Sequence, residues 1–136
     1  RTFKDPRCAT NIARRTIQTV MAIQKESEIK ITVGLDENRI PETIVWDASD
    51  GGVTNEEAKA LMMGVWDEKT SECLRIDLWT KDMLMDDMKR MFHQTFISMA
   101  DGYERATDDT ALAADMRDFA RYFGEKSGII EPGKEG

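Results

Sequence analysis

The sequence predicts a single α+β domain, in which helices cover the apolar face of a three-stranded antiparallel sheet. Three observations support this fold class. Residues 29–35 and 74–79 alternate apolar and polar side chains with the period of a half-buried strand. Residues 82–107 and 109–123 repeat apolar side chains every three or four positions, as amphipathic helices do. At 136 residues and 40% apolar content, the chain has the size and composition of one soluble domain.

Two strands are expected before residue 50. Within residues 29–35, isoleucine, valine and leucine alternate with other residues, so one face of this strand should be buried. A polar turn over residues 36–39 leads to Pro41, which can begin a strand but cannot lie inside a central one. Residues 43–48 alternate in the same way, and the connection of several residues predicts an antiparallel hairpin whose register the sequence does not specify. Ser49–Gly52 then interrupts the pattern.

A helix is expected next. Thr54–Glu57 has the Ser/Thr-x-x-Glu form of a capping box, which marks a helix start. Gly64 weakens such a helix by about 1 kcal/mol relative to alanine, a cost that a packed domain tolerates. We therefore expect a helix over residues 54–66 and a charged turn over residues 67–72. Its core-facing stripe comprises Ala58, Leu61, Met62, Val65 and Trp66.

The third strand, Leu74–Trp79, leads directly into a helix of roughly 24 residues, about 36 Å long. Thr80 or Asp82 is expected to cap this helix, whose apolar period continues across Gly102. The predicted order is therefore β-β-α-β-α-α.

The last helix is expected to start at Asp108 or Asp109 and to end at Gly124 or Gly128. Its predicted apolar face comprises Leu112, Met116, Phe119, Ala120 and Phe123.

The net charge of −7 argues against a nucleic-acid-binding protein, whose footprint is a basic face. No stretch is apolar enough to span a membrane. Residues 1–20 contain five basic residues and one acidic residue, so they carry +4 and the other 116 residues carry −11. This segment fits an Arg-rich targeting sequence, a basic arm for an acidic partner or a disordered extension, and we expect the extension. The domain then comprises residues 21–130, beginning at Met21, with a flexible tail over residues 131–136.

No motif in the sequence indicates an enzyme, a cofactor or a metal site. The single histidine, His93, has no carboxylate or second ligand three or four positions away, and we expect a partly exposed structural role for it. The carboxylate pairs at 86–87 and 108–109 fall at predicted helix starts, where capping and the helix dipole account for them. Cys8 and Cys73 form no CxxC pair and are expected to be reduced thiols. We therefore expect no catalytic residues and no bound cofactor or metal.

Two features are candidates for a partner-binding surface. If the leucine and isoleucine side chains of residues 74–78 face the core, Arg75, Asp77 and Trp79 lie on the opposite face of the strand. An aromatic side chain flanked by charges can anchor a protein partner, and covering the outer face of the sheet is an equal alternative. The long helix is also rich in methionine, which suits adaptable interfaces. Met88 and Met91 are therefore candidates as well, although their spacing favours core packing.

Six segments between residues 21 and 130 carry a specific resemblance in uninterrupted order. They are SEIKITVGLDENRIPETIVW (Ser27–Trp46), NEEAKALMMGVWD (Asn55–Asp67), LRIDLWTKDM (Leu74–Met83), MKRMFHQTFISMAD (Met88–Asp101), ERATDD (Glu104–Asp109) and MRDFARYFGEK (Met116–Lys126). Together they resemble the gliding-motility protein GldC family of the Bacteroidetes. None of the six is a catalytic motif. Residues 1–20 have no counterpart, in agreement with a domain that begins at Met21.

The resemblance implies an accessory protein of bacterial gliding, a surface movement tied to a dedicated protein-secretion system. It implies a protein partner from the gliding or secretion machinery and no catalytic residues. It also implies a cytoplasmic location, with the inner face of the membrane as a possible site of action. We accordingly expect a non-catalytic protein that acts by protein contact, of which a chaperone-like role is one form. The alternative is a small-molecule-binding or hydrolytic domain that uses surface carboxylates. The oligomeric state is not predicted.

Overall fold

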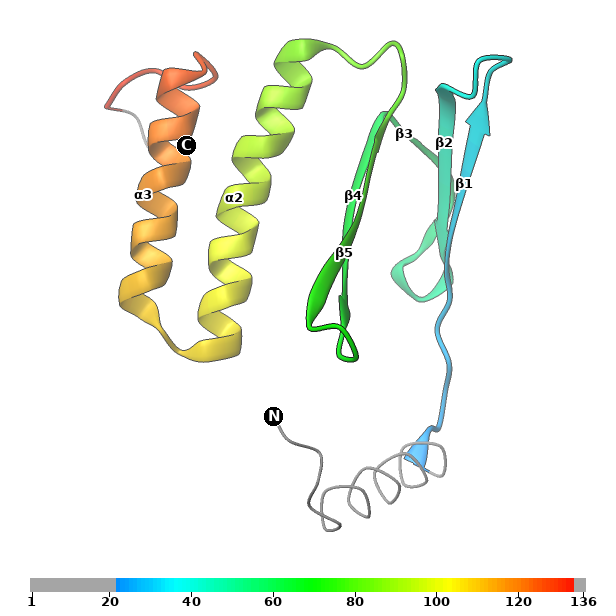
Figure 1. Ribbon diagram of the computed structural model, residues 1–136, viewed down its shortest axis with the longest axis horizontal. Helices are drawn as coiled ribbons and strands as arrows, with labels where there is room; N and C mark the ends of the chain where they lie inside the picture. The colour runs from blue at the N-terminus through cyan, green and yellow to red at the C-terminus, as the bar shows by residue number, and fades with distance from the viewer. Residues whose placement is uncertain (1–21, 134–136) are drawn as a thin grey trace. The chain divides into compact units, whose positions relative to one another are not determined.

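The computed structural model describes residues 22–133 and confirms the α+β class (Figure 1). The expectations for residues 1–20, for Cys8 and for the last residues of the tail lie outside this range. The elements in chain order are β1 (Ile29–Leu35), β2 (Pro41–Ala48), the short 3-10 helix η1 (Ser49–Gly51), β3 (Val53–Ala58), β4 (Ala60–Asp67), β5 (Glu72–Trp79), α2 (Met85–Thr107) and α3 (Thr110–Lys126).

Two antiparallel sheets are present, one with the strand order β1-β2-β3 and one formed by β4 and β5. The chain divides into two compact units, which comprise residues 22–31 with 46–56 and residues 32–45 with 57–133 of the described range. The first predicted hairpin is confirmed, because β1 and β2 are neighbours and β2 begins at Pro41. The predicted burial of one β1 face is only partly correct, since Ile29 and Leu35 are exposed whereas Ile31 and Val33 are half-buried.

The helix predicted over residues 54–66 is wrong, because this stretch forms β3 and β4. The capping box does not form: Asn55 has a left-handed φ of 54°, and its N–H donates to Asp47 Oδ1 at 2.8 Å. Residues 60–67 instead pair along their full length with β5, from Ala60 opposite Trp79 to Asp67 opposite Glu72. A short run of apolar residues is compatible with either a helix or a buried strand, and here the hydrogen-bonded pairing with β5 selects the strand.

This correction changes the predicted order to β-β-β-β-β-α-α. The third predicted strand is confirmed as β5, but it pairs with β4 in a two-stranded sheet and does not join the first hairpin. The charged turn predicted over residues 67–72 is confirmed as the β4–β5 loop, where Asp67 Oδ1 accepts the N–H of Lys69 at 2.9 Å. The face of β5 predicted to be buried is about half exposed at Leu74 and Ile76.

The long helix is confirmed as α2, with 23 residues that run continuously through Gly102. Its predicted cap is wrong: the residue before the helix is Leu84, whose side chain makes no capping hydrogen bond. For α3, the predicted cap is correct, because Asp109 Oδ1 accepts the N–H of Leu112 at 3.0 Å. Gly128, with a left-handed φ of 81°, follows the end of α3, whereas the alternative stop, Gly124, lies buried inside the helix.

Small residues let α2 and α3 pack side by side (Figure 1). Ala100, Ala113, Ala120 and Gly124 are all buried, so the two backbones can approach closely. His93 is only 5% exposed, which corrects the expectation of a partly exposed histidine. The cause is the missing side chain of Gly124: a Cβ there would lie 2.9 Å from Cδ2 of the His93 ring. The imidazole occupies the space that a larger residue would fill.

Candidate functional site

Three of the predicted binding residues lie together on one face of the β4–β5 hairpin. Directly opposed residues share a face in an antiparallel pair, and Trp79, Asp77 and Arg75 lie opposite Ala60, Met62 and Gly64. Arg75 Nη2 and Asp77 Oδ1 form an ion pair at 2.8 Å, and this bond raises the pKa of the Arg75 guanidinium. Trp79 remains 54% exposed. The strand therefore presents a tryptophan beside a neutralised charge pair.

Trp79 borders a cleft of about 270 Å³, which we call the Trp79 cleft. Ile40, at 45% exposure, contributes a second accessible apolar side chain to it. At this cleft the turn after β1 lies beside the end of β5, which comes about forty residues later in the chain. Sequence reasoning missed the contributions from before β5, because a local pattern does not show such long-range proximity. The lining residues are Ile40, Pro41, Asp77, Leu78, Trp79 and Lys81.

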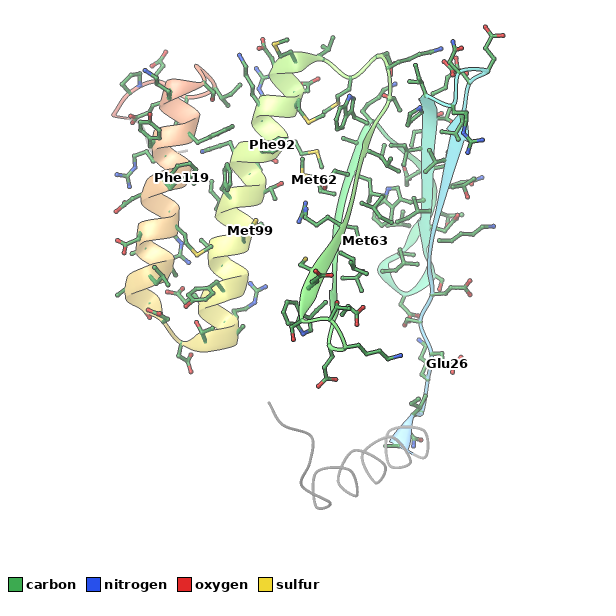
Figure 2. All side chains as sticks on the ribbon, in the orientation of Figure 1. Glu26, Met62, Met63, Phe92, Met99 and Phe119 are labelled. Atoms are coloured by element: carbon green, nitrogen blue, oxygen red, sulfur yellow. The ribbon has the colours of Figure 1, made fainter. Side chains whose placement is uncertain are left out.

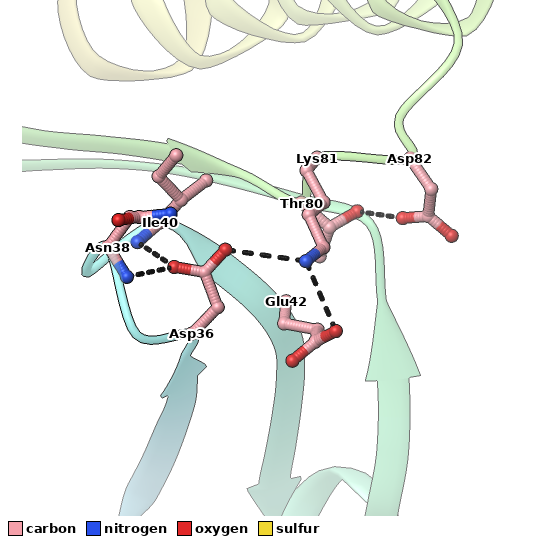
Figure 3. Close-up of polar contacts among 7 residues, drawn as sticks. All are labelled: Asp36, Asn38, Ile40, Glu42, Thr80, Lys81 and Asp82. Carbon is pink, nitrogen blue, oxygen red and sulfur yellow. Dashed lines mark hydrogen bonds and ion pairs between the residues drawn. The ribbon is translucent and has the colours of Figure 1, made fainter.

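A hydrogen-bonded turn holds Ile40 in place (Figure 3). Asp36 Oδ1 accepts the N–H groups of Asn38 at 2.8 Å and of Ile40 at 3.0 Å. The Asp36 N–H in turn donates to the Ile40 carbonyl at 2.9 Å. Arg39 completes the turn with a left-handed φ of 64°. An aspartate that bonds the backbone a few residues ahead is a common way to stabilise a polar turn, and here it fixes one wall of the Trp79 cleft.

Lys81 ties this turn to the end of β5. Its Nζ lies 3.3 Å from Asp36 Oδ2 and 3.2 Å from Glu42 Oε1, as the dashed lines in Figure 3 show. Its backbone N–H donates to the Pro41 carbonyl at 3.1 Å. The two carboxylates, Glu42 first, raise the pKa of the Lys81 ammonium. Main chain and side chain of one residue thus connect two segments that are distant in sequence.

Thr80 and Asp82 have a different role from the predicted helix cap. Thr80 is buried, its N–H donates to the Lys59 carbonyl at 2.8 Å, and its Oγ1 donates to Asp82 Oδ1 at 2.6 Å. Asp82 Oδ2 also forms an ion pair with Lys59 Nζ at 2.7 Å. The Lys59 ammonium, followed by the Thr80 hydroxyl, lowers the pKa of Asp82. These bonds fix the chain where it leaves β5 and explain why neither side chain caps α2.

The Asp36 carboxylate should make the free energy of unfolding depend on pH in the acid range. Hydrogen bonds from the Ile40 N–H, and then from the Asn38 N–H and Lys81, hold the pKa of Asp36 below its ordinary 3.8. Because the pKa of Asp36 is lower in the folded state than in the unfolded state, its ionised carboxylate stabilises the fold at pH values above the unfolded pKa. This contribution is lost as the pH falls through the folded pKa. We expect Asp36→Asn to reduce the loss of unfolding free energy between about pH 5 and pH 2.5 in urea titrations. Identical pH profiles for the two proteins would contradict this role.

The predicted methionines do not belong to the Trp79 cleft. Met88 is half-buried on α2. Met91 lines a separate, shallow depression of about 470 Å³ on α2, together with Asp87, Arg90, Gln94, Thr95 and Ser98. The structure thus brings together Arg75, Asp77 and Trp79 and leaves the two methionines elsewhere.

Two kinds of feature are absent from the part of the chain that the structure describes. Within residues 22–133, no three histidine, cysteine, aspartate or glutamate side chains gather closely enough to hold a metal ion. Over the same range, no helix combines the length and apolar character needed to cross a bilayer.

Comparison with known proteins identifies the family. No curated protein and no solved structure is significantly similar to the chain. The family model described as gliding motility-associated protein GldC-like matches residues 41–129, a range that includes most of the Trp79 cleft and both helices. The match spans 89 of the 136 residues and confirms the resemblance seen in the sequence, so the chain belongs to the GldC-like family of gliding motility-associated proteins.

Proposed function

We propose that the protein is a non-catalytic accessory protein of bacterial gliding that binds a component of the gliding or associated secretion machinery through the Trp79 cleft. The observation that carries this proposal is the pair formed by Trp79 and Ile40, two large apolar side chains that are about half exposed around one cleft. Membership of the GldC-like family supports the association with gliding.

The cleft has the features of a binding anchor. Tryptophan is the residue type most enriched among interface hot spots, because it buries a large rigid surface on binding. The hydrogen bonds of Asp36 and Lys81 hold the walls in place before any partner arrives. A prearranged site loses less conformational entropy on binding than a flexible one. The nearby charges are already paired, so an apolar partner side chain can cover the cleft without isolating a charge.

The charge of the protein indicates the character of the partner. Residues 21–136 carry −11, and a strongly acidic protein attracts basic partners over long distances and increases their association rate. We propose a partner segment in which an apolar side chain enters the Trp79 cleft and basic residues flank it. A chaperone-like action on that partner, in the cytoplasm and peripherally at the inner membrane, belongs to the same proposal.

Replacing Trp79 should abolish most of the binding. We expect Trp79→Ala to weaken capture of gliding or secretion components by about 30-fold, the effect of losing a hot spot of about 2 kcal/mol. The experiment immobilises the full chain, exposes it to lysate of a gliding bacterium and identifies the retained proteins by mass spectrometry. Affinity for each identified component is then measured with purified proteins.

The matched control is Trp66→Ala. Trp66 lies opposite Cys73 on the same hairpin face, is 64% exposed and does not line the Trp79 cleft. Capture should be unchanged in this variant. Undiminished capture by a folded Trp79→Ala protein, or equal losses in both variants, would show that the cleft is not the binding site.

The alternative of a small-molecule-binding or hydrolytic domain is less well supported by the geometry. Ligand pockets usually enclose about 300–1,000 Å³ and bury most of the ligand. The Trp79 cleft measures about 270 Å³ and is open, and the depression beside Met91, although about 470 Å³ in volume, is shallow. A metabolite or divalent cation that raises the melting temperature in a saturable way would favour this alternative.

A further inference from the structure

The helical hairpin carries a second apolar surface, independent of the Trp79 cleft. Figure 2 shows Phe92 and Met99 on α2 and Phe119 on α3. We call the surface the aromatic face and define it as Phe92, Phe96 and Met99 of α2 with Leu112, Phe119, Tyr122 and Phe123 of α3. Five of these side chains are 39–58% exposed, namely Phe92, Met99, Leu112, Phe119 and Tyr122.

The rings of the aromatic face form one continuous cluster. Phe96 is central, with ring centroids 5.3 Å from Phe119 and 5.1 Å from Phe123. Phe92 extends the cluster along α2 at 6.5 Å from Phe96, and Tyr122 extends it along α3 at 6.0 Å from Phe119. Pairs of aromatic rings at these distances attract one another, so the rings form one apolar surface that spans both helices.

The exposed area matches the apolar part of a standard interface. A half-exposed side chain of this size leaves roughly 90 Å² accessible, so the five exposed members present about 450 Å². The largest apolar patch on an ordinary monomer covers about 300–600 Å² and is often functional. A stable interface buries about 800 Å² per partner, of which roughly 450–520 Å² is apolar. The aromatic face therefore supplies what one side of such an interface requires.

Charge determines which partner suits this surface. At 3.6 residues per turn, the acidic residues of α2 lie about 120° or more around the helix axis from Phe92. On the aromatic side of α2, the charged residue is Lys89, about 60° from Phe92. Within α3, Asp115 and Lys126 lie on the side of Phe119, and Asp118 and Glu125 border Tyr122. Two basic and three acidic residues thus border the aromatic face, a nearly balanced set on an acidic protein, so an equally acidic molecule can approach it without strong repulsion.

From this area and charge pattern, we infer that the aromatic face is where a second copy of this chain binds, forming a two-fold symmetric dimer. In such a dimer both copies use the same surface, so every contact between two residues occurs twice, once on each side of the symmetry axis. If two α3 helices cross antiparallel around the Phe119–Tyr122 region, Asp115 of one copy lies opposite Lys126 of the other, and the reverse pair forms at the opposite end. The surface is therefore complementary to itself in both apolarity and charge.

The first test is the mass of the full chain in solution. One chain has a mass of 15.5 kDa, and light scattering coupled to size exclusion should give twice this value. Phe119→Glu should weaken dimerisation at least 100-fold, because the symmetry places the new charge twice in the apolar centre. Trp66→Glu is the matched control, since it adds the same charge at an exposed aromatic position on β4 and should leave the dimer intact.

A charge exchange tests the geometry without altering the apolar centre. Asp115→Lys and Lys126→Glu should each weaken the dimer about 10-fold, because like charges then face each other. The double variant should restore affinity to within about threefold of the original. Circular dichroism checks that all variants retain their helices.

Two results would overturn the inference. The first is a monomeric wild-type chain up to about 100 μM, whether another protein or another part of the same chain then covers the aromatic face. The second is a dimer that resists Phe119→Glu but is broken by Trp66→Glu.

Discussion

Replacing Ile44 by alanine should lower the free energy of unfolding by about 2–5 kcal/mol, the usual cost of removing three buried carbon atoms from a core. Ile44 is 2% exposed and is one of the two largest fully buried side chains in the described part of the chain, the other being Thr80. Both line a small cavity of about 30 Å³, which the substitution would enlarge. The other buried hydrophobic residues in this range are alanines, whose small side chains cannot fill the space that the substitution leaves.

Urea denaturation followed by circular dichroism measures this effect, and Ile29→Ala is the matched control. Ile29 also lies in a strand but is 70% exposed, so the same chemical change should cost less than about 1 kcal/mol there. Equal losses in the two variants would mean that Ile44 does not contribute to the core as its burial indicates.

Introducing valine at Gly124 should destabilise the protein by about 3 kcal/mol, because the new side chain enters a filled space. A Cβ at this position would lie 2.9 Å from Cδ2 of His93 and 2.9 Å from Cγ1 of Ile130. The Ile130 side chain can rotate, but the His93 ring is held in the buried region beside α3. The His93 ring or the α3 backbone must therefore move to admit the larger residue.

Gly102→Val is the matched control, because Gly102 also lies inside a helix. The nearest atom to a Cβ there is Nη2 of Arg105, at 3.8 Å, which is an ordinary contact. Valine and glycine differ by only about 0.4 kcal/mol in helix propensity, so this variant should be nearly neutral. If Gly124→Val were equally neutral in thermal and chemical unfolding, the close packing of His93 against α3 would be incorrect.

Local patterns were sufficient where an element's own residues settle its structure. The apolar period of α2 continues through Gly102, and a single glycine costs too little to interrupt a helix of this length. Asp109 caps α3 as predicted because the cap acts within three residues. The same reasoning failed at Thr54–Glu57, where the capping-box pattern is present but the residues belong to the strand β3.

The Trp79 cleft was only partly predictable. The alternation of β5 placed Arg75, Asp77 and Trp79 on one face, and the ladder with β4 agrees with this. Neither alternation nor composition could show that Ile40 lies at the same cleft, because that proximity depends on Lys81 bonding the turn at Asp36.

By itself, the sequence determined the α+β class, both helices, the strand Leu74–Trp79 and the family, since each depends on patterns within a few residues or on an ordered set of segments. Tertiary structure decided that residues 60–67 form a strand, that His93 is buried and that Trp79 meets Ile40 at one cleft. These outcomes depend on partners that are distant in the chain. Local propensities amount to only a few tenths of a kcal/mol per residue. They are outweighed by three tertiary interactions, namely the pairing of β4 with β5, the packing of His93 into the space beside Gly124 and the bonds of Lys81.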